Sequence, residues 1–151
     1  MIQPLDENTV AKLKFVNMDG TSFERDIQQD LMMSEESFEQ DLLRQPSEYA
    51  WWTAVMLQAK EKYKEAETQL DYVKAVLGDQ ARATLGKATV AQVNDFVVQQ
   101  QDYQDAVNTA NWWGSRVDQL QYVVKAYEQR AQLLIQLGAQ LRHSIENSKY
   151  V

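Results

Sequence analysis

The side chains best placed to bind a ligand in this chain are basic residues that gather in one stretch. They are Lys60, Lys62, Lys64, Lys74, Arg82 and Lys87. Lysine and arginine neutralise phosphates, and binding through them weakens as salt rises. A solvated face with ion pairs one helical turn apart is the alternative, because the first of these residues alternate with Glu61, Glu65, Glu67 and Asp71. Lys74, Arg82 and Lys87 are less compensated by acids, so they are the better candidates for binding a polyanion.

Aromatic residues form a second group that could bind. In each of two Trp-Trp pairs one tryptophan, Trp52 or Trp113, falls on an apolar seam and is expected in the core. Four aromatic residues fall off this seam: Trp51, Tyr72, Trp112 and Tyr122. Exposed aromatics of this kind line an interface between subunits or stack on unpaired bases. The sequence leaves both roles open for these four residues.

Residues for catalysis or metal binding are lacking. The chain has no cysteine, and His143 is its only histidine. A metal site is therefore not expected. The sequence contains no Gly-rich phosphate loop and no nucleophile elbow, and carboxylates on exposed helix faces are not tuned for acid–base catalysis. We expect neither an enzyme nor a bound cofactor.

A repeating pattern of apolar residues, with steps of three and four, indicates which helices position these groups. We call this pattern the apolar seam. It runs through Tyr49, Trp52, Met56, Ala59, Tyr63, Ala66, Leu70, Val73 and Leu77, and again through Tyr103, Ala106, Ala110, Trp113, Val117, Leu120, Val124, Tyr127, Ala131, Leu134, Gly138, Leu141 and Ile145. This is the a/d spacing of a coiled coil. The sequence therefore predicts a mainly α protein, built as a long antiparallel coiled-coil-like helical hairpin.

The pattern also predicts where the two helices begin, end and meet. The first should run from Ser47 to Leu77 and end by Gly86, and the second from Asp102 to Asn147. Antiparallel pairing with Leu77 beside Val117 places Tyr49 beside Ile145. The stretch 103–113 then overshoots the first helix and needs another partner. Exposed lateral apolar surface of this kind favours a homo-oligomer larger than a dimer.

Shorter elements are expected around the hairpin. Thr89 begins a capping-box pattern that opens a short connecting helix, and a break follows at 99–101. Pro46 should interrupt the helical pattern, with Ser34 capping a short helix before it and Ser47 capping the long helix after it. Near the N-terminus, two β-capable runs, 11–16 and 21–27, flank an Asp-Gly turn and predict a β-hairpin.

Charge divides the chain into two parts. Residues 1–43 hold ten acidic and three basic residues, a net of −7, and residues 44–151 hold twelve of each. We therefore expect an acidic N-terminal arm over 1–43 with the β-hairpin and short helix. Residues 44–151 would form the helical hairpin. Acidic arms are most often solubilising, and less often dock a partner or mimic nucleic acid.

The sequence also bears on location. The N-terminal residues lack the charged and apolar regions of a signal peptide. No apolar stretch approaches the length of a membrane span. Together with the lack of cysteine, this predicts a reducing cytoplasm and no membrane partner.

Three runs in the second half carry a resemblance to a known family. They are Asn111-Trp112-Trp113-Gly114, Val124 to Arg130, and Leu133 to Arg142. With them the chain resembles the C-terminal helix of phage recombination mediator proteins of the UvsY type. Gln45 to Trp52 and Leu70 to Leu77 are similar to the first helix of that family. The resemblance covers roughly residues 44–147.

The resemblance implies a helical, ring-forming homo-oligomer that binds single-stranded DNA in the cytoplasm of a phage's host. Such proteins help a RecA-like recombinase displace single-strand-binding protein, so these two are the implied partners. In the family, basic residues near the end of the first helix contribute to DNA binding. Lys74 matches that position, whereas the neighbouring position, which can also be basic, is Val76 here. Together with the charge pattern, the expected DNA-binding residues are Lys60, Lys64, Lys74, Arg82 and Lys87.

A protein of another class would share this fold. It is a non-enzymatic coiled-coil scaffold or assembly chaperone in phage morphogenesis that binds no nucleic acid. The two classes differ in the role of Lys74, Arg82 and Lys87, so a salt-dependent DNA-binding measurement separates them.

Overall fold

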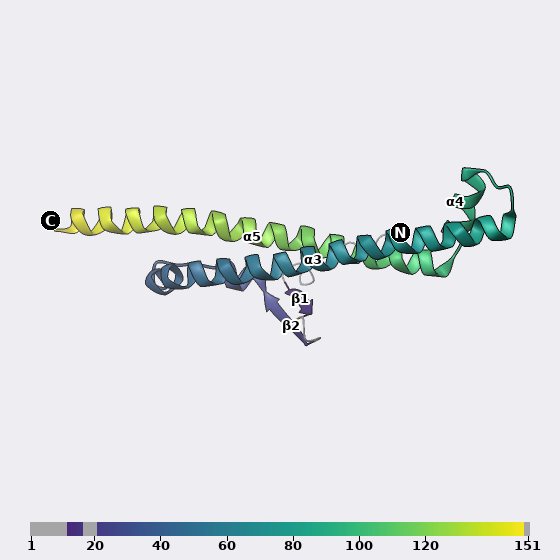
Figure 1. Ribbon diagram of the computed structural model, residues 1–151. Helices are drawn as coiled ribbons and strands as arrows, with labels where there is room; N and C mark the ends of the chain where they lie inside the picture. Colours follow the sequence, from purple (N-terminus) through teal and green to yellow (C-terminus); the bar gives the residue numbers. More distant parts are fainter. Residues whose placement is uncertain (1–11, 17–20, 150–151) are drawn as a thin grey trace, which may run out of the picture. The chain divides into compact units, whose positions relative to one another are not determined.

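The computed structural model of the protein describes residues 12–16 and 21–149 (Figure 1). It is mainly helical, with long helices packed against each other and a small two-stranded antiparallel sheet near the N-terminus. The elements in chain order are β1 (Lys12–Val16), β2 (Ser22–Asp26), α2 (Ile27–Leu31), α3 (Phe38–Leu85), α4 (Val90–Val98) and α5 (Gln101–Ser148). The predicted mainly α hairpin with a connecting helix and an N-terminal β-hairpin is confirmed.

The chain divides into two compact units, and both long helices run through both of them. Unit 1 comprises residues 1–50 and 123–151, and unit 2 comprises residues 51–122. Unit 1 therefore holds the start of α3 and the end of α5, while unit 2 holds α4 and the remaining parts of both long helices.

The predicted apolar seam is the buried face of both long helices. On α3, Trp52 is fully buried, and on α5 so is Tyr127. Every other seam residue is buried or half-buried except Ile145, which is 56% exposed. A stripe with a/d spacing stays on one side of a helix over many turns, which explains why residues so far apart in sequence share one face.

The predicted register of the two helices is wrong. In unit 1 the hydroxyl group of Tyr49 donates a hydrogen bond to Glu128 over 3.0 Å, so Tyr49 does not lie beside Ile145. In unit 2 the ring of Tyr63 lies against Gly114. The prediction assumed that the pairing starts at Leu77 and Val117. The pairing instead extends to the end of α3, and Tyr103 packs on the cluster that contains Leu77.

As a consequence, the unpaired end of the hairpin is not the stretch 103–113. In unit 1 the site of a Cβ on Gly138 would lie only 2.9 Å from the ring of Phe38, which is the first residue of α3. Helix α5 continues from Gly138 to Ser148, about 15 Å further at 1.5 Å per residue. The C-terminal end of α5 therefore extends past the start of α3.

Helix α4 connects α3 to α5 and packs against the end of α3 in unit 2. Val93 and Val97 of α4 are buried with Leu77 and Ala81 of α3 in one apolar cluster. The predicted capping box at Thr89 is present, since its side chain accepts from the backbone N–H of Gln92. Helix α3 ends as predicted before Gly86, whose φ of 70° is a left-handed conformation that glycine adopts without strain. The predicted break at 99–101 separates α4 from α5.

Pro46 does not interrupt the helix, contrary to the prediction, because α3 runs through it. Proline lacks an N–H and its ring pushes against the carbonyl one turn earlier. The flanking residues Asp41 and Gln45 are both held by Arg130 of α5, which keeps this turn helical. Ser47, predicted as an N-cap, instead donates its hydroxyl to the carbonyl of Arg44 over 2.9 Å.

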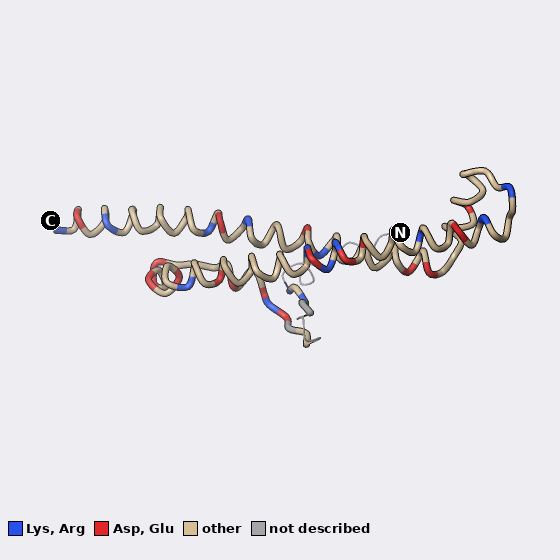
Figure 2. Tube along the Cα trace, viewed as in Figure 1, with Lys and Arg blue, Asp and Glu red and all other residues tan. Residues whose placement is uncertain are grey.

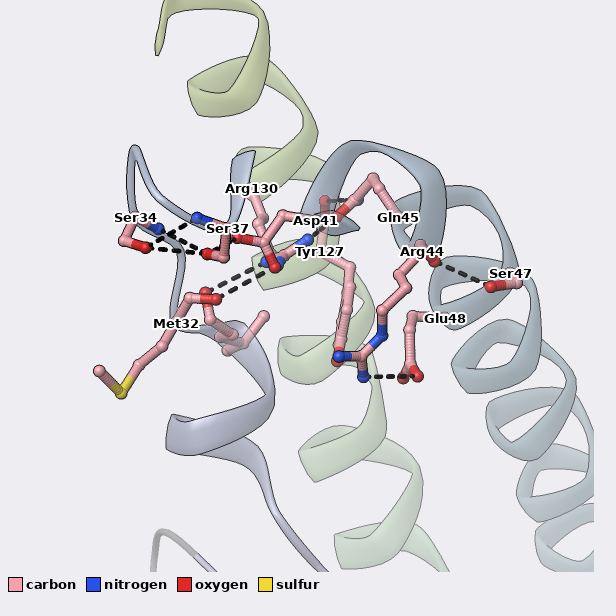
Figure 3. A network of polar contacts seen from close by, with 11 residues as sticks. Met32, Ser34, Ser37, Asp41, Arg44, Gln45, Ser47, Glu48, Tyr127 and Arg130 are labelled. Atoms are coloured by element: carbon pink, nitrogen blue, oxygen red, sulfur yellow. Dashed lines mark hydrogen bonds and ion pairs between the residues drawn. The ribbon is translucent and has the colours of Figure 1, made fainter. Parts of the chain in front are cut away.

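A buried polar network in unit 1 was not predicted (Figure 3). The Arg130 guanidinium donates to Asp41 (2.8 Å), to Gln45 (2.7 Å) and to the backbone carbonyls of Leu31 (3.1 Å) and Met32 (3.2 Å). Gln45 in turn donates to the carbonyl of Tyr127 over 2.6 Å. This network joins α3, α5 and the chain that follows α2.

The start of the chain is attached by further polar contacts. The Oγ of Ser34 accepts from the N–H of Ser37 in the turn before α3, and the helix that follows is not a separate short helix but α3, which begins at Phe38. Arg25 of β2 pairs with Asp30 and with Glu48 of α3, at 2.8 and 2.9 Å. The predicted hairpin forms with Lys12 opposite Asp26, and its predicted Asp-Gly turn lies outside the described residues. Helix α2 was not predicted.

Candidate nucleic-acid interface

The five basic residues expected to bind DNA all lie in unit 2 and are exposed. Lys60, Lys64 and Lys74 are on α3, Arg82 is in its last turn, and Lys87 is in the connection to α4. Basic residues mark the end of α3 and the loop that follows it (Figure 2). The positions expected from the sequence are therefore all available to solvent.

These residues are not equally close to one another. Lys74 and Arg82 are eight residues apart, about 12 Å along α3, and Lys87 follows shortly after the helix. Lys60 lies about 21 Å before Lys74 on the same helix. Arg82 pairs with Asp79 over 2.9 Å, but both side chains are well exposed, and such surface pairs contribute at most about 1 kcal/mol. Lys74, Arg82 and Lys87 therefore form the denser group, which we call the basic end.

Carboxylates lie beside the lysines along the middle of α3. Lys60, Glu67 and Lys74 follow each other at seven-residue steps and so lie on one side of the helix. A hydrogen bond to Glu67 and the negative charge of Asp118 on α5 raise the pKa of the Tyr63 phenol above its ordinary value. Because the Tyr63 ring lies against Gly114, this side of the helix pair includes Gly114 and Asp118. We call it the lysine side.

The four off-seam aromatic residues are exposed, as their spacing predicts. Tyr72 is 63% exposed, Trp112 is 45% exposed, and Trp51 and Tyr122 are also exposed. On an α-helix successive residues are about 100° apart. Trp51 is nine residues before Lys60, so it points about 180° away from it, and Tyr72 points about 160° away from Lys74. Trp51 and Tyr72 therefore lie on the opposite side of α3 from Lys60 and Lys74. Lys62, two residues after Lys60, lies on the same side as Trp51 and pairs there with Glu65 over 2.8 Å.

One cation of unit 2 lies with the aromatic residues and was missed in the sequence. The guanidinium of Arg116 lies over the ring of Trp112, 4.8 Å from its centroid, and its Nη1 donates to Gln119 over 3.2 Å. Both Trp112 and Arg116 are two residues from Gly114 and point about 160° away from it. We call the side with Trp51, Tyr72, Trp112 and Arg116 the aromatic side. The four-residue spacing of a tryptophan and an arginine on a predicted helix could have revealed this contact.

Three findings on other kinds of site concern the part of the chain that the structure describes. Among residues 12–16 and 21–149, no group of His, Asp and Glu side chains could hold a metal ion. Within the same residues no helix is both long enough and apolar enough to cross a membrane. An apolar groove of about 420 Å³ in unit 1, lined by Pro46, Tyr49, Tyr127 and Ala131 among others, contains none of the predicted site residues.

Comparisons with protein-family models, with curated proteins and with solved structures return no match to this chain.

Proposed function

We propose that the protein is a recombination mediator that binds single-stranded DNA and helps to load a RecA-like recombinase onto strands coated by single-strand-binding protein. The observation that carries the proposal is the basic end, where Lys74, Arg82 and Lys87 are exposed at one end of unit 2. Three exposed cations near one another can neutralise neighbouring phosphates of a flexible strand. The resemblance of residues 44–147 to mediator proteins supplies the biological role.

Acidic residues elsewhere in unit 2 weaken the attraction of a single basic end for DNA, so binding should depend on several copies of this site. Residues 51–122 hold seven basic and nine acidic residues, a net of −2. A single copy therefore attracts DNA only through a local patch. Several copies in one homo-oligomer would present several basic ends to one strand, and linked weak sites bind far more tightly than one.

The C-terminal end of α5 supports self-association. Its seam continues through Leu141 and Ile145, past the point where α3 begins, and Ile145 is 56% exposed. A seam segment without its antiparallel partner gains stability when a second copy covers it. This surface, and not the stretch 103–113, supports the proposed homo-oligomer, for which the resembled family implies a ring.

The experiment that tests the proposal measures binding of the full-length protein to a short fluorescent oligo(dT) over a range of salt concentrations. We expect binding at low salt, a preference over the matching duplex, and a linear fall of log affinity with log salt. A second measurement adds the protein to a recombinase reaction on a strand coated by single-strand-binding protein, where filament formation should be faster. No binding at low salt would refute the proposal.

The second candidate is a coiled-coil scaffold or assembly chaperone in phage morphogenesis. The observation that favours it is the net negative charge of unit 2 and of residues 1–43, because a negatively charged surface repels nucleic acid. A stable homo-oligomer that fails to bind oligo(dT) at low salt is the result expected for this class. The cytoplasm of a phage's host is the proposed location for both.

A further inference from the structure

Arg116 is held differently from the four arginines of the described chain that form ion pairs. Arg25, Arg44, Arg82 and Arg130 each form an ion pair with a carboxylate. Arg116 has no carboxylate partner among the described residues and instead lies on the ring of Trp112. Its Nη1 donates to the neutral amide of Gln119. The positive charge of Arg116 is thus oriented by its neighbours without being neutralised by them.

This arrangement suits a phosphate better than a carboxylate-paired arginine does. A guanidinium is planar and donates hydrogen bonds in its own plane, so an indole ring against its face blocks none of its donors, and here one of them is used by Gln119. Its orientation is set before binding, which lowers the entropy lost when a ligand is bound. The ordinary role of such a pair is a helix contact worth about 0.5–1 kcal/mol at an exposed site, and the two roles make different predictions for binding.

The two sides of unit 2 also differ in what they offer to a single strand. The aromatic side combines exposed rings with a cation, and proteins that bind single strands stack bases on aromatic rings while cations contact the backbone. The lysine side offers cations, but Glu67 and Asp118 are close enough to raise the pKa of Tyr63. A phosphate on the lysine side would therefore lie near the carboxylates of Glu67 and Asp118. A phosphate bound by Arg116 would not compete with a carboxylate already paired with that arginine.

We infer that single-stranded DNA leaves the basic end along the aromatic side of unit 2, with a phosphate bound by Arg116 and an adjacent base stacked beside Trp112. This inference rests on the proposed function and specifies the path of the strand. Arg116 is a binding residue in this arrangement. Trp112 holds the guanidinium in place and offers its exposed surface to the base.

The test is the salt dependence of oligo(dT) binding by full-length variants. Arg116→Gln should weaken binding roughly three- to tenfold at low salt and make the slope of log affinity against log salt shallower by about 0.7, the value for one lost phosphate contact. The loss should be equal for oligo(dT) and a mixed-sequence oligonucleotide, because phosphate contacts carry no sequence information. Lys125→Gln, which removes one exposed charge elsewhere on α5, is the matched control and should leave the slope unchanged. In the wild type, tryptophan emission should fall on binding, and Trp112→Phe should remove most of that fall.

Several outcomes would overturn the inference. If wild-type protein does not bind oligo(dT), the proposed function fails and the inference fails with it. If wild-type protein binds but Arg116→Gln acts like Lys125→Gln, the inference alone fails. A loss caused by Lys60→Gln but not by Arg116→Gln would place the strand on the lysine side. If Arg116→Gln leaves DNA binding intact but dissociates the oligomer, the aromatic side is an interface between copies. Circular dichroism on each variant excludes loss of helicity as the cause.

Discussion

Arg130 and Asp41 form a buried ion pair at 2.8 Å in unit 1, with only 5% and 9% of the two side chains exposed. The pair joins α5 to the first turns of α3. Ser37 donates to the second oxygen of Asp41 over 2.6 Å. Arg130 also donates to the backbone carbonyls of Leu31, the last residue of α2, and of Met32, which follows it. Because four of the five N–H groups of the guanidinium donate hydrogen bonds, the pair is held by geometry as well as by charge.

Loss of Arg130 should be strongly destabilising. Arg130→Leu leaves the Asp41 carboxylate and the carbonyls of Leu31 and Met32 without their donor, which costs about 3–5 kcal/mol in comparable buried pairs. Arg44→Leu is the matched control, because Arg44 is 61% exposed and pairs with Glu48 over 3.4 Å; it should cost less than about 1 kcal/mol. Urea unfolding followed by circular dichroism compares the two, and equal midpoints would contradict this account of the network.

The apolar seam could be predicted from the sequence, but the register between the two long helices and the continuity of α3 at Pro46 could not. Burial of Trp52, Tyr127 and Leu134 follows from a/d spacing alone. The register between the helices depends on where the pairing starts, which is set by how α4 folds back on Leu77 and Ala81. No local pattern encodes that contact. The same holds for the continuity of α3 at Pro46, which depends on residues of α5 more than 80 positions away.

The types and exposure of the candidate site residues could be predicted from the sequence, but their ion-pair partners could not. Exposure of Lys74 and Trp112 follows from their positions off the seam. That Trp51 and Tyr72 point away from Lys60 and Lys74 also follows from helical periodicity, and could have been derived from the sequence. That Arg116 lacks a carboxylate partner could not, because it requires the position of every acidic side chain near it.

Removal of the basic end should weaken DNA binding without unfolding the protein. Lys74, Arg82 and Lys87 are exposed, and the one observed pair among them, Arg82 with Asp79, is a surface pair. Replacing all three by Ala should reduce affinity for oligo(dT) and make the salt slope shallower by up to about 2, at about 0.7 per phosphate contact. Fluorescence anisotropy measures both quantities. An unchanged slope with unchanged circular dichroism would favour the scaffold or assembly chaperone over the recombination mediator.

Disruption of the extended seam should lower the mass of the oligomer. Leu141→Glu with Ile145→Glu places charge on the part of α5 that extends past the start of α3. Each apolar side chain buried between copies contributes about 1.5–3 kcal/mol, so the loss of two should shift dissociation into the micromolar range or beyond. Sedimentation velocity and native mass spectrometry should show an assembly larger than a dimer in the wild type and smaller species in the variant. Leu57→Glu, which is exposed but off the seam, is the control; a monomeric wild type would refute self-association itself.

The acidic arm, residues 1–43, should compete with DNA for the basic residues. Some residues of the arm make contacts that hold the fold, so the test should change its charge without deleting it. Deletion of the arm would remove the carbonyls that bind Arg130 and the Arg25 pair with Glu48, so it would mix stability with charge. Glu24, Glu35, Glu36 and Glu39 are exposed and take part in none of these contacts. Changing these four to Gln keeps the contacts and removes four of the ten negative charges of the arm.

If the arm competes for the basic residues within one molecule, this variant should bind oligo(dT) more tightly at low salt, because a tethered segment acts at an effective concentration near millimolar. The gain should fade at high salt, where charges separated by more than about 8–10 Å are screened. If the arm instead docks a partner, DNA affinity should stay the same while the recombinase or single-strand-binding protein is lost in a pull-down. A variant that matches the wild type in both assays would leave the arm a solubilising segment, since its charge would then affect neither DNA nor partner.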